Sequence, residues 1–465
     1  MTMHERRNKM RSEIDMTSGN LFKKLLLFSI PLALTGMLQL LYTAADLIVC
    51  GTFGSNHSVA AISGTNSLVN LIVNLFIGLS VGANVLIARS YGENNKDKAE
   101  RVMYTAIIFS IFFGIVVGLF GFFFSKYFLV WMSTPNDVID LSTDYLKIYF
   151  LGLPFVMLYN FGAGILRGLG DTRRPFIILA ISGVINVLLN LLFVIAFDMD
   201  VNGVATATVI SQGVSAILVF LILYKNKGFI RFKFKDLRFY PKEALEIARI
   251  GIPSGLQGVA FSISNVLIQS SVNSLGTLVM DGNGASGSLE GFIYVSMNSV
   301  AQGAVAFVSA NYGAGKKENI RKIVIYSLIL VFLMNLLVGG TILLLQNQLL
   351  PLYIKFDEAL DAAKSRLLVI ATTYFLCGFM DVLASSLRGL GYSLTPMIIT
   401  LVGVCVLRIV WIYTLFQIEA MHNLPWLAGS YPISWGLTTI VNGIVFIVAY
   451  KKTKFETNNL ELVAE

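Results

Sequence analysis

The chain has 465 residues, of which 55% are apolar and only 13% are charged, with a formal net charge of +8 and a mean hydropathy of +0.73. Because an ordinary soluble domain carries about 25% charged residues, this composition excludes a typical soluble enzyme, a disordered chain and a collagen-like chain. The basic residues lie in short loops between apolar runs, so membrane topology explains the positive charge and no nucleic-acid partner is expected.

Twelve apolar runs are long enough to cross a hydrocarbon core of ~30 Å, which takes about 20 helical residues. Only helices and closed barrels satisfy their backbone groups in lipid, and these runs are continuous rather than alternating. The sequence therefore predicts an all-α polytopic membrane protein with twelve transmembrane helices. In chain order the predicted spans are 25–50, 57–87, 102–125, 139–166, 175–197, 203–225, 246–276, 286–311, 322–347, 360–387, 395–417 and 429–450.

The distribution of basic residues predicts the orientation of these spans. Roughly 29 of the 35 Lys and Arg residues lie in the two tails and in alternate connections, which places both termini in the cytoplasm. The one long polar stretch in the middle of the chain predicts a linker between two halves. The expected parts are a tail at 1–20, a six-helix lobe at 21–225, a linker at 226–245, a second six-helix lobe at 246–452 and a tail at 453–465.

The two halves match each other at a shift of about 221 residues, as transporter halves often do. Gly82 corresponds to Gly303, and the LRGLG motif that starts at Leu166 recurs at Leu387. Each half has an even number of spans, so both halves insert the same way round and form a parallel repeat. This plan favours an alternating-access transporter, with a channel built from repeats or a duplication kept only for packing as alternatives.

Cysteine and histidine do not form a chemical site in this sequence. Cys50, Cys377 and Cys405 fall in or at the ends of apolar runs, and the three histidines are scattered in tails and loops. Their spacing fits neither a metal site nor a disulfide framework, and no acid pair has a catalytic spacing. We expect neither an enzyme nor a cofactor, and the polar start of the chain does not resemble a cleavable signal.

Several segments resemble multidrug and toxic compound extrusion (MATE) transporters. They are FSIPLALTGMLQLLYTAADLIVCGTFG, IARSYGENNKDKAE, LRGLGDTRRP and LRGLGYSLTP, and the resemblance covers residues 17–452. It is nearest to the prokaryotic branch of the multidrug/oligosaccharide-lipid/polysaccharide flippase superfamily. The resemblance implies two six-helix lobes around a V-shaped cleft in a bacterial cytoplasmic membrane. It also implies export of amphiphilic and cationic compounds, driven by entry of H⁺ or Na⁺, and we expect a monomer.

Charged groups inside a membrane are costly and point to function. Asp46 lies in the first span about 33 Å beyond Lys24, and Tyr42 is one turn earlier on the same side. A desolvated carboxylate holds a proton more tightly, or it can offer a hard oxygen ligand to a cation. The alternative is a carboxylate in the outer headgroup region without a role.

Polar side chains on the fifth and sixth spans are expected near Asp46. Asn186 and Asn190 are four residues apart and share one helix face, and Thr208 lies near the outer end of the next span. The alternative is hydrogen bonding between helices. The resemblance implies a cation site made of Asp46, Asn160, Asn186, a carboxylate on the fifth span and Thr208. Here Asn190 stands at that carboxylate position, so Asp46 is the only acid, and a Na⁺ ion would use Asp46, Asn186 and Asn190 while a proton would need Asp46 alone.

Asn160 and Asp381 occupy equivalent positions of the two repeats, each seven residues before the arginine of LRGLG. Asn160 lies about 10 Å from the inner end of its span, deeper than its supposed partners. Asp381 could attract a cationic substrate or exchange a proton. The structural alternative is an ion pair with Arg408, for which the depths differ by about 8 Å, and for Arg408 we favour that structural role.

A flat hydrophobic cation would suit a cleft lined by aromatic and methionine side chains, through cation–π contacts and adaptable packing. The candidates are Tyr42, Tyr145, Met157, Phe261 and Met297, beside Asp381 and Arg408.

The sequence as a whole predicts a secondary active antiporter that exports amphiphilic cations in exchange for H⁺ or Na⁺, with Asp46 as the main coupling group. Pro31 could bend the first span and couple Asp46 to cleft closure, or it could be a tolerated kink. The alternatives are a flippase for a lipid-linked saccharide or lipid, and a channel or receptor without active transport.

Overall fold

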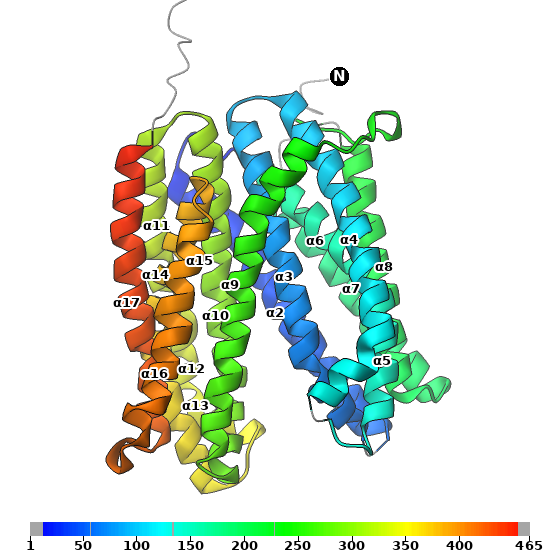
Figure 1. The fold of residues 1–465 in the computed structure, drawn as a ribbon, viewed down its shortest axis with the longest axis vertical. Coiled ribbons are helices and arrows are strands. Elements are labelled where there is room, and N and C mark those ends of the chain that lie inside the picture. Colours follow the sequence, from blue (N-terminus) through cyan, green and yellow to red (C-terminus); the bar gives the residue numbers. More distant parts are fainter. Residues whose placement is uncertain (1–12, 56, 133, 227, 454–465) are drawn as a thin grey trace, which may run out of the picture. The chain divides into compact units, whose positions relative to one another are not determined.

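The computed structural model describes residues 13–55, 57–132, 134–226 and 228–453, and over these ranges it contains helices and no strand. Eleven helices are long and apolar enough to cross a membrane, and a bent helix pair brings the number to twelve. The predicted all-α fold with twelve spans is confirmed (Figure 1).

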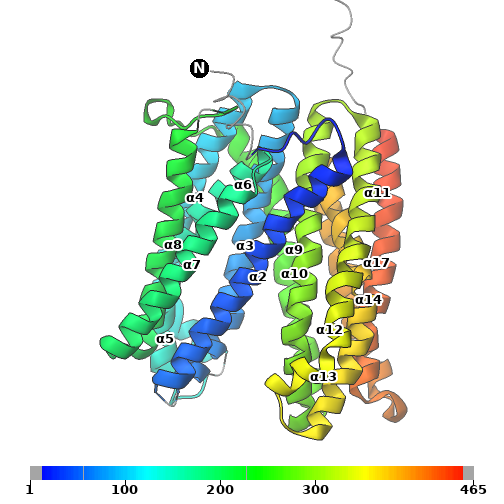
Figure 2. The same cartoon turned by 180° about the vertical axis from the view of Figure 1, so that it is seen from behind.

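The first repeat contains seven helices. They are α2 (Leu21–Phe53), α3 (Ser58–Gly92), α4 (Lys96–Trp131), α5 (Ile139–Leu151), α6 (Leu153–Gly168), α7 (Arg173–Leu191) and α8 (Asp200–Lys225). The second repeat is seen from behind in Figure 2. It contains α9 (Pro241–Asn273), α10 (Thr277–Gly313), α11 (Lys317–Met334), α12 (Gly340–Leu344), α13 (Gln346–Leu349), α14 (Asp357–Gly389), α15 (Leu394–Thr400), α16 (Leu407–Tyr413) and α17 (Leu424–Lys452).

The fourth span is broken rather than continuous. Helices α5 and α6 meet at Gly152 with a bend of 47°. Pro154 follows in the first turn of α6, where its missing N–H costs no helical hydrogen bond. The single run predicted at 139–166 is therefore two helices, and the break coincides with the Gly-Leu-Pro sequence.

Three spans contain a short π-helical stretch. These stretches are η1 (Leu192–Ala196), η3 (Asn335–Gly339) and η5 (Leu401–Val406). Insertions of this kind in helices are frequent at functional sites. The first stretch begins two residues after Asn190, and the third stretch ends two residues before Arg408.

The chain divides into two compact units that do not follow the repeat boundary. The N-unit comprises Met1–Ile14, Leu34–Tyr91 and Asn95–Gly255, and the C-unit comprises Asp15–Ala33, Gly92–Asn94 and Leu256–Glu465. The first part of α2 therefore belongs to the C-unit, and the first part of α9 belongs to the N-unit. The expected lobes at 21–225 and 246–452 differ from these units by this exchange.

Close helix crossings explain why the first parts of α2 and α9 each belong to the unit of the other repeat. In the N-unit a Cβ added to Gly82 of α3 would lie 2.3 Å from the backbone oxygen of Ile247 in α9, so only glycine allows this approach. In the C-unit the ring of Phe28 in α2 packs edge-on against Phe307 of α10, with centroids 5.4 Å apart. Gly303, the repeat mate of Gly82, faces Leu25 of α2 in the same crossing.

The expected polar linker at 226–245 is partly a packed segment. Ile230 and Phe232 are 0% and 1% exposed, and the Phe232 ring lies 5.4 Å from the ring of Tyr104 in α4. The backbone N–H of Lys233 donates to the Tyr104 hydroxyl at 3.2 Å. Apolar and polar residues alternate here, so Ile230 and Phe232 point into the N-unit, whereas Phe234 is exposed. The last residues of the predicted linker already belong to α9.

A short folded segment precedes α2 in the C-unit. The carboxylate of Asp15 accepts hydrogen bonds from the backbone N–H and the hydroxyl of Thr17 at 2.9 and 3.0 Å, and from the hydroxyl of Ser18. Burial alone would raise the pKa of Asp15, but these hydrogen bonds outweigh it and lower the pKa to about 2. Asn311 of α10 donates to the carbonyl of Met16 at 2.8 Å, which fixes the segment to its own unit.

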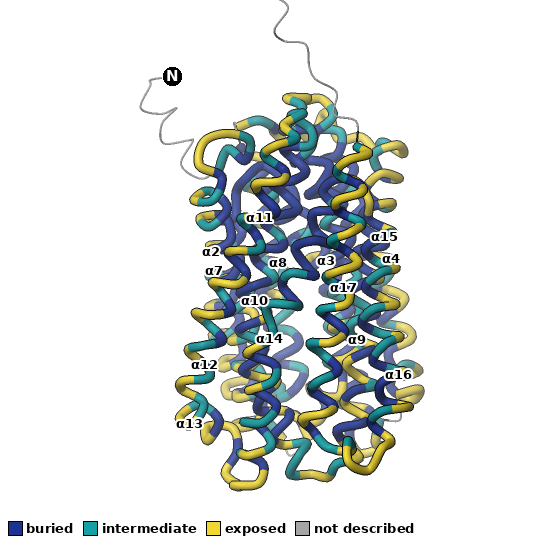
Figure 3. The backbone as a smooth tube through the Cα atoms, turned by 90° about the vertical axis from the view of Figure 1, so that its left-hand side faces the viewer, coloured by how far each residue is buried: buried dark blue, intermediate teal, exposed yellow. Residues whose placement is uncertain are grey.

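The outward faces of the spans are apolar and exposed, as a lipid solvent requires. Phe123, Leu188 and Ile217 are 69%, 61% and 59% exposed. Buried and exposed residues alternate along the helices in Figure 3. Most polar residues buried among the described ones are Ser, Thr and Asn, and few are charged.

Candidate functional site

Four polar side chains of the N-unit form one hydrogen-bonded chain. Nδ2 of Asn190 donates to Oδ1 of Asp46 at 2.5 Å and to Oδ1 of Asn186 at 3.3 Å. Nδ2 of Asn186 donates to Oγ1 of Thr208 at 3.4 Å. The two asparagines are 5% and 0% exposed. The structure thus brings together Asp46, Asn190, Asn186 and Thr208 from three helices, and we call this group the Asp46 chain.

The local sequence explains how the chain forms. Asn186 and Asn190 are one turn apart on α7, so both face the same neighbours. Asp46 comes from the second part of α2, which belongs to the N-unit, and Thr208 comes from α8. These positions are spaced along three helices that pack in one unit, and a single carboxylate is the only acid among them.

The oxygen atoms of the Asp46 chain fit a small cation or a proton. Oδ1 of Asn190 is buried and has no hydrogen-bond partner among the described residues. That oxygen and the Asp46 carboxylate are hard ligands, which suit an alkali cation. If the amide group of Asn190 rotates, its Oδ1 could instead accept the hydrogen of a protonated Asp46. No cluster of three His, Cys, Asp or Glu residues occurs in the part of the chain that the structure describes.

Tyr42 lies beside the Asp46 chain without joining it. Its ring rests on Gly183 of α7, where an added Cβ would lie 1.7 Å from Cζ of the ring. Its hydroxyl is 3.4 Å from the carbonyl oxygens of Leu179 and Ala180. Tyr42 therefore packs α2 onto α7, and it holds the helix that carries Asp46.

Asn160, which the resemblance placed in the same site, bonds elsewhere. Its Nδ2 donates to the carbonyl of Val156 in its own helix at 2.8 Å. No hydrogen bond joins it to the Asp46 chain within the described ranges. Its depth in the span, which differs from that of the other members, accounts for the separation.

The alternative of an Asp381–Arg408 ion pair is not supported, because the two side chains turn to different helices. Asp381 faces α10, where Nδ2 of Asn298 lies 3.5 Å from Oδ2. Arg408 faces α9 and α17, with Nε donating to Oγ of Ser434 at 3.1 Å and Nη1 to Oγ of Ser264 at 3.5 Å. Among the described residues Arg408 forms no salt bridge.

The structure contains a buried ion pair that sequence reasoning missed. Glu290 of α10 accepts from Nε and Nη2 of Arg366 in α14 at 2.9 and 2.8 Å, and Ser286 donates to the same carboxylate at 2.8 Å. Both charged residues are nearly buried, at 5% and 6% exposure. Glu290 is the fifth residue of the span predicted at 286–311 and is therefore expected near its end, but α10 begins at Thr277, nine residues earlier than predicted. The burial of Arg366 could have been predicted from its helical spacing. It lies three or four residues from Ala363 and Ile370, on the same face of α14 as Ala359, and this face is buried.

The expected aromatic and methionine lining lies mostly in packed interiors. Met157 and Met297 are 0% and 1% exposed, and Tyr145 is 6% exposed with its ring stacked on Tyr149. Phe261 is partly buried against a core cluster of the C-unit. These positions therefore contribute to packing within each unit.

Comparisons with known proteins agree with the arrangement. Residues 31–192 and 253–414 each match the model of the MatE family. The chain is 26% identical to the probable multidrug resistance protein YoeA of Bacillus subtilis, over 83% of this chain and 85% of that protein. It is 28% identical to the probable multidrug resistance protein YpnP of the same organism, over 85% and 88%.

A solved structure described as the outward-facing conformation of a multidrug resistance MATE family transporter shares this fold. The TM-score is 0.88 at 22% identity, with 95% of this chain and 99% of that chain covered. A second structure, described as MATE in the bent conformation, has a TM-score of 0.86 at 22% identity, with 93% and 96% covered.

The two family matches fall one in each repeat. The first match begins at residue 31 and the second at residue 253, a shift of 222 residues over stretches of equal length. Pro31 of α2 thus corresponds to Pro253 of α9, and each proline lies two residues before the point where its helix passes from one unit to the other.

Proposed function

The chain belongs to the MatE family, and from this premise we propose that it is a secondary active antiporter that exports amphiphilic cations in exchange for H⁺ or Na⁺. Its relatives named as multidrug resistance proteins support this class of substrate. The observation that carries the proposal is the Asp46 chain, a hydrogen-bonded group of two buried asparagines and two half-buried residues, with Asp46 as its one titratable member inside a membrane span.

Asp46 is the proposed coupling group. A carboxylate held among amides and apolar residues within a membrane is costly when it is charged and unpaired, so binding of a cation or a proton relieves that cost. A proton needs only Asp46, while Na⁺ would also use oxygens of Asn186 and Asn190. Asn190 supports both alternatives, because its Nδ2 hydrogen-bonds Asp46 and its Oδ1 is free to accept or to ligate.

Helix α2 is the proposed link between ion binding and transport. Its second part carries Asp46 in the N-unit, and its first part belongs to the C-unit. Pro31 lies inside the helix and removes one backbone hydrogen bond, so the helix can bend near this residue. We propose that loading of Asp46 changes this bend. Two solved structures with this fold are described as MATE in the bent and in the straight conformation.

The test is export of a fluorescent lipophilic cation from proteoliposomes, with a pH gradient and a Na⁺ gradient imposed separately. Asp46→Asn should abolish gradient-driven transport, and the gradient that drives the wild type identifies the ion. The matched control is Asp140→Asn, which makes the same chemical change at an exposed carboxylate that pairs with Lys126 at 3.1 Å. Transport in neither gradient by folded wild-type protein would refute the antiport and direct attention to a lipid-linked substrate.

A further inference from the structure

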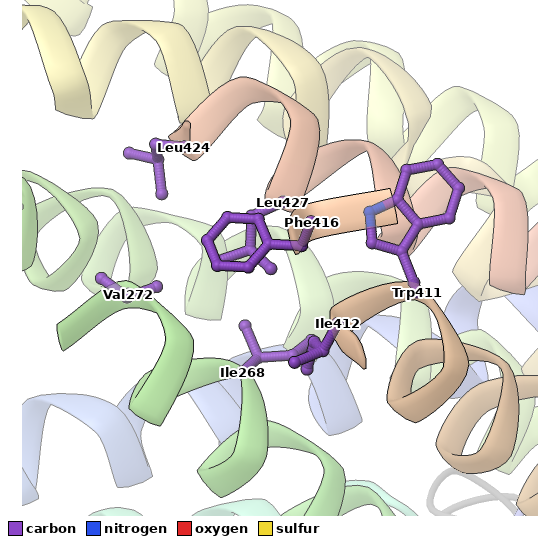
Figure 4. Packing of buried hydrophobic residues seen from close by; sticks show 7 residues of the cluster. All are labelled: Ile268, Val272, Trp411, Ile412, Phe416, Leu424 and Leu427. Atoms are coloured by element: carbon purple, nitrogen blue, oxygen red, sulfur yellow. The ribbon is translucent and has the colours of Figure 1, made fainter. Parts of the chain in front are cut away.

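The core of the C-unit between α9 and α16 is apolar. Ile268 of α9 and Ile412 of α16 belong to one core cluster with Val272, Phe416 and Leu427 (Figure 4).

Arg408 of α16 is a charged residue beside this apolar core. It is 2% exposed, and its neighbours Ser264 and Ser434 are neutral hydroxyls. Nη2 of Arg408 is buried and has no hydrogen-bond acceptor among the described residues.

The charges around Arg408 do not cancel. The guanidinium carbon of Arg408 lies 4.1 Å from the centre of the Tyr431 ring, and that of Arg366 lies 5.1 Å from the same ring. Glu290 neutralises Arg366 through two hydrogen bonds. This group of four side chains therefore carries one net positive charge inside the membrane-spanning part of the C-unit, where a charge without a counterion is costly.

The aromatic rings offset part of this cost but leave donors unused. The Tyr431 ring attracts the guanidinium through its face. The centre of the Trp435 ring is 5.7 Å from the guanidinium carbon, and Nε1 of this buried indole also has no acceptor in the described part of the chain. Two buried N–H donors beside an uncompensated cation are the chemistry of an anion site.

We propose that the C-unit binds a small monovalent anion at Arg408, between α9, α16 and α17. The ligand is a halide ion or the carboxylate group of a transported compound, since both are compact acceptors with one negative charge. It would accept a hydrogen bond from Nη2 of Arg408 and balance the charge of the buried group. The π-helical stretch η5 ends two residues before Arg408, at a place where the regular helix pattern is already interrupted. This proposal does not rest on the proposed antiport.

The first experiment measures the thermal stability of the purified full-length protein at constant ionic strength, while sodium bromide or sodium benzoate replaces sodium methanesulfonate, which has neither a halide ion nor a carboxylate. Binding to the folded state gives a saturable rise in melting temperature. The wild type should show this rise with at least one of the two salts. Arg408→Asn removes the guanidinium charge and the Nη2 donor, and it should lose the saturable rise. The matched control is Arg231→Asn, at an exposed residue of the linker, which should keep it.

A response to bromide alone identifies a free halide as the ligand, and a response to benzoate identifies a carboxylate. No saturable response to either salt, or an equal response in Arg408→Asn, would overturn the proposal. If Arg408→Asn does not fold, crystals of the wild type soaked in bromide and, separately, in 4-bromobenzoate provide a second measurement. An anomalous bromine peak beside Nη2 is then expected with at least one of the two, and the absence of a peak with both would refute the site.

Discussion

The buried ion pair of the C-unit allows a sharp prediction. Glu290→Gln leaves Arg366 without its counterion, next to the ring that already faces Arg408. Arg366→Gln leaves the Glu290 carboxylate with a single described donor, the hydroxyl of Ser286. Removal of one partner of a buried pair costs about 3–5 kcal/mol, because the other charge stays buried.

This loss of free energy of unfolding can be converted to a shift in melting temperature. The C-unit has about 230 residues, and an unfolding entropy of about 2.1 cal/mol/K per residue makes 1 kcal/mol worth about 2 °C in a unit of this size. Each single substitution should therefore lower the melting temperature of the unit by about 6–10 °C. The double variant removes both charges and should recover most of this loss, because two neutral amides of similar shape replace the pair.

The assay is thermal unfolding of the purified protein in detergent, followed by intrinsic fluorescence. The four proteins of the double-mutant cycle are compared at one pH and one salt concentration. Single variants within about 2 °C of the wild type would show that the pair is not buried as described. A double variant that loses the sum of the two single effects would refute the electrostatic reasoning.

Three further predictions concern other parts of the molecule. Phe232→Ala should destabilise the N-unit by about 3–5 kcal/mol because it empties a packed site, whereas Phe234→Ala, at 63% exposure, should cost little in the same thermal assay. Gly183→Ala should displace the α2 tyrosine that rests on this glycine and lower the melting temperature, while Gly284→Ala, in open space, should not. Asp15 has a pKa lowered to about 2, so its contribution to stability is present above the unfolded value of about 3.9 and is lost as the pH falls from about 4 to about 2. Asp15→Asn should therefore be less stable than the wild type at pH 6, and the two melting temperatures should converge near pH 2.

The membrane spans could be predicted because a helix that crosses the hydrocarbon core must be about 20 residues long and mostly apolar. The start of α10 was missed because the residues after Thr277 are small and polar, in the stretch DGNGASGS. Hydropathy does not detect such a helix, which buries one face against α14 through close contacts such as Gly282 on Ala359. The missed start is also why Glu290 was placed near a helix end.

The Asp46 chain could be predicted in part, since intramembrane polar residues on one helix face are few. The partners of Arg408 could not be predicted, because they depend on the rotation of α16. One residue turns a helix by about 100°, and a depth along the axis does not indicate which neighbour a side chain meets. Asp381 and Arg408 have compatible depths, but they point toward different helices.

The exchange of helix halves between the units has a consequence for biosynthesis. When α8 has left the ribosome, the N-unit still lacks the first part of α9, and the first part of α2 has no α10 to pack against. The nascent chain must therefore hold α2 without its C-unit partner, and an N-unit without α9, in the bilayer until the second repeat is inserted. A gene cut after residue 225 should yield two fragments that are each degraded alone and become stable only when they are synthesised together.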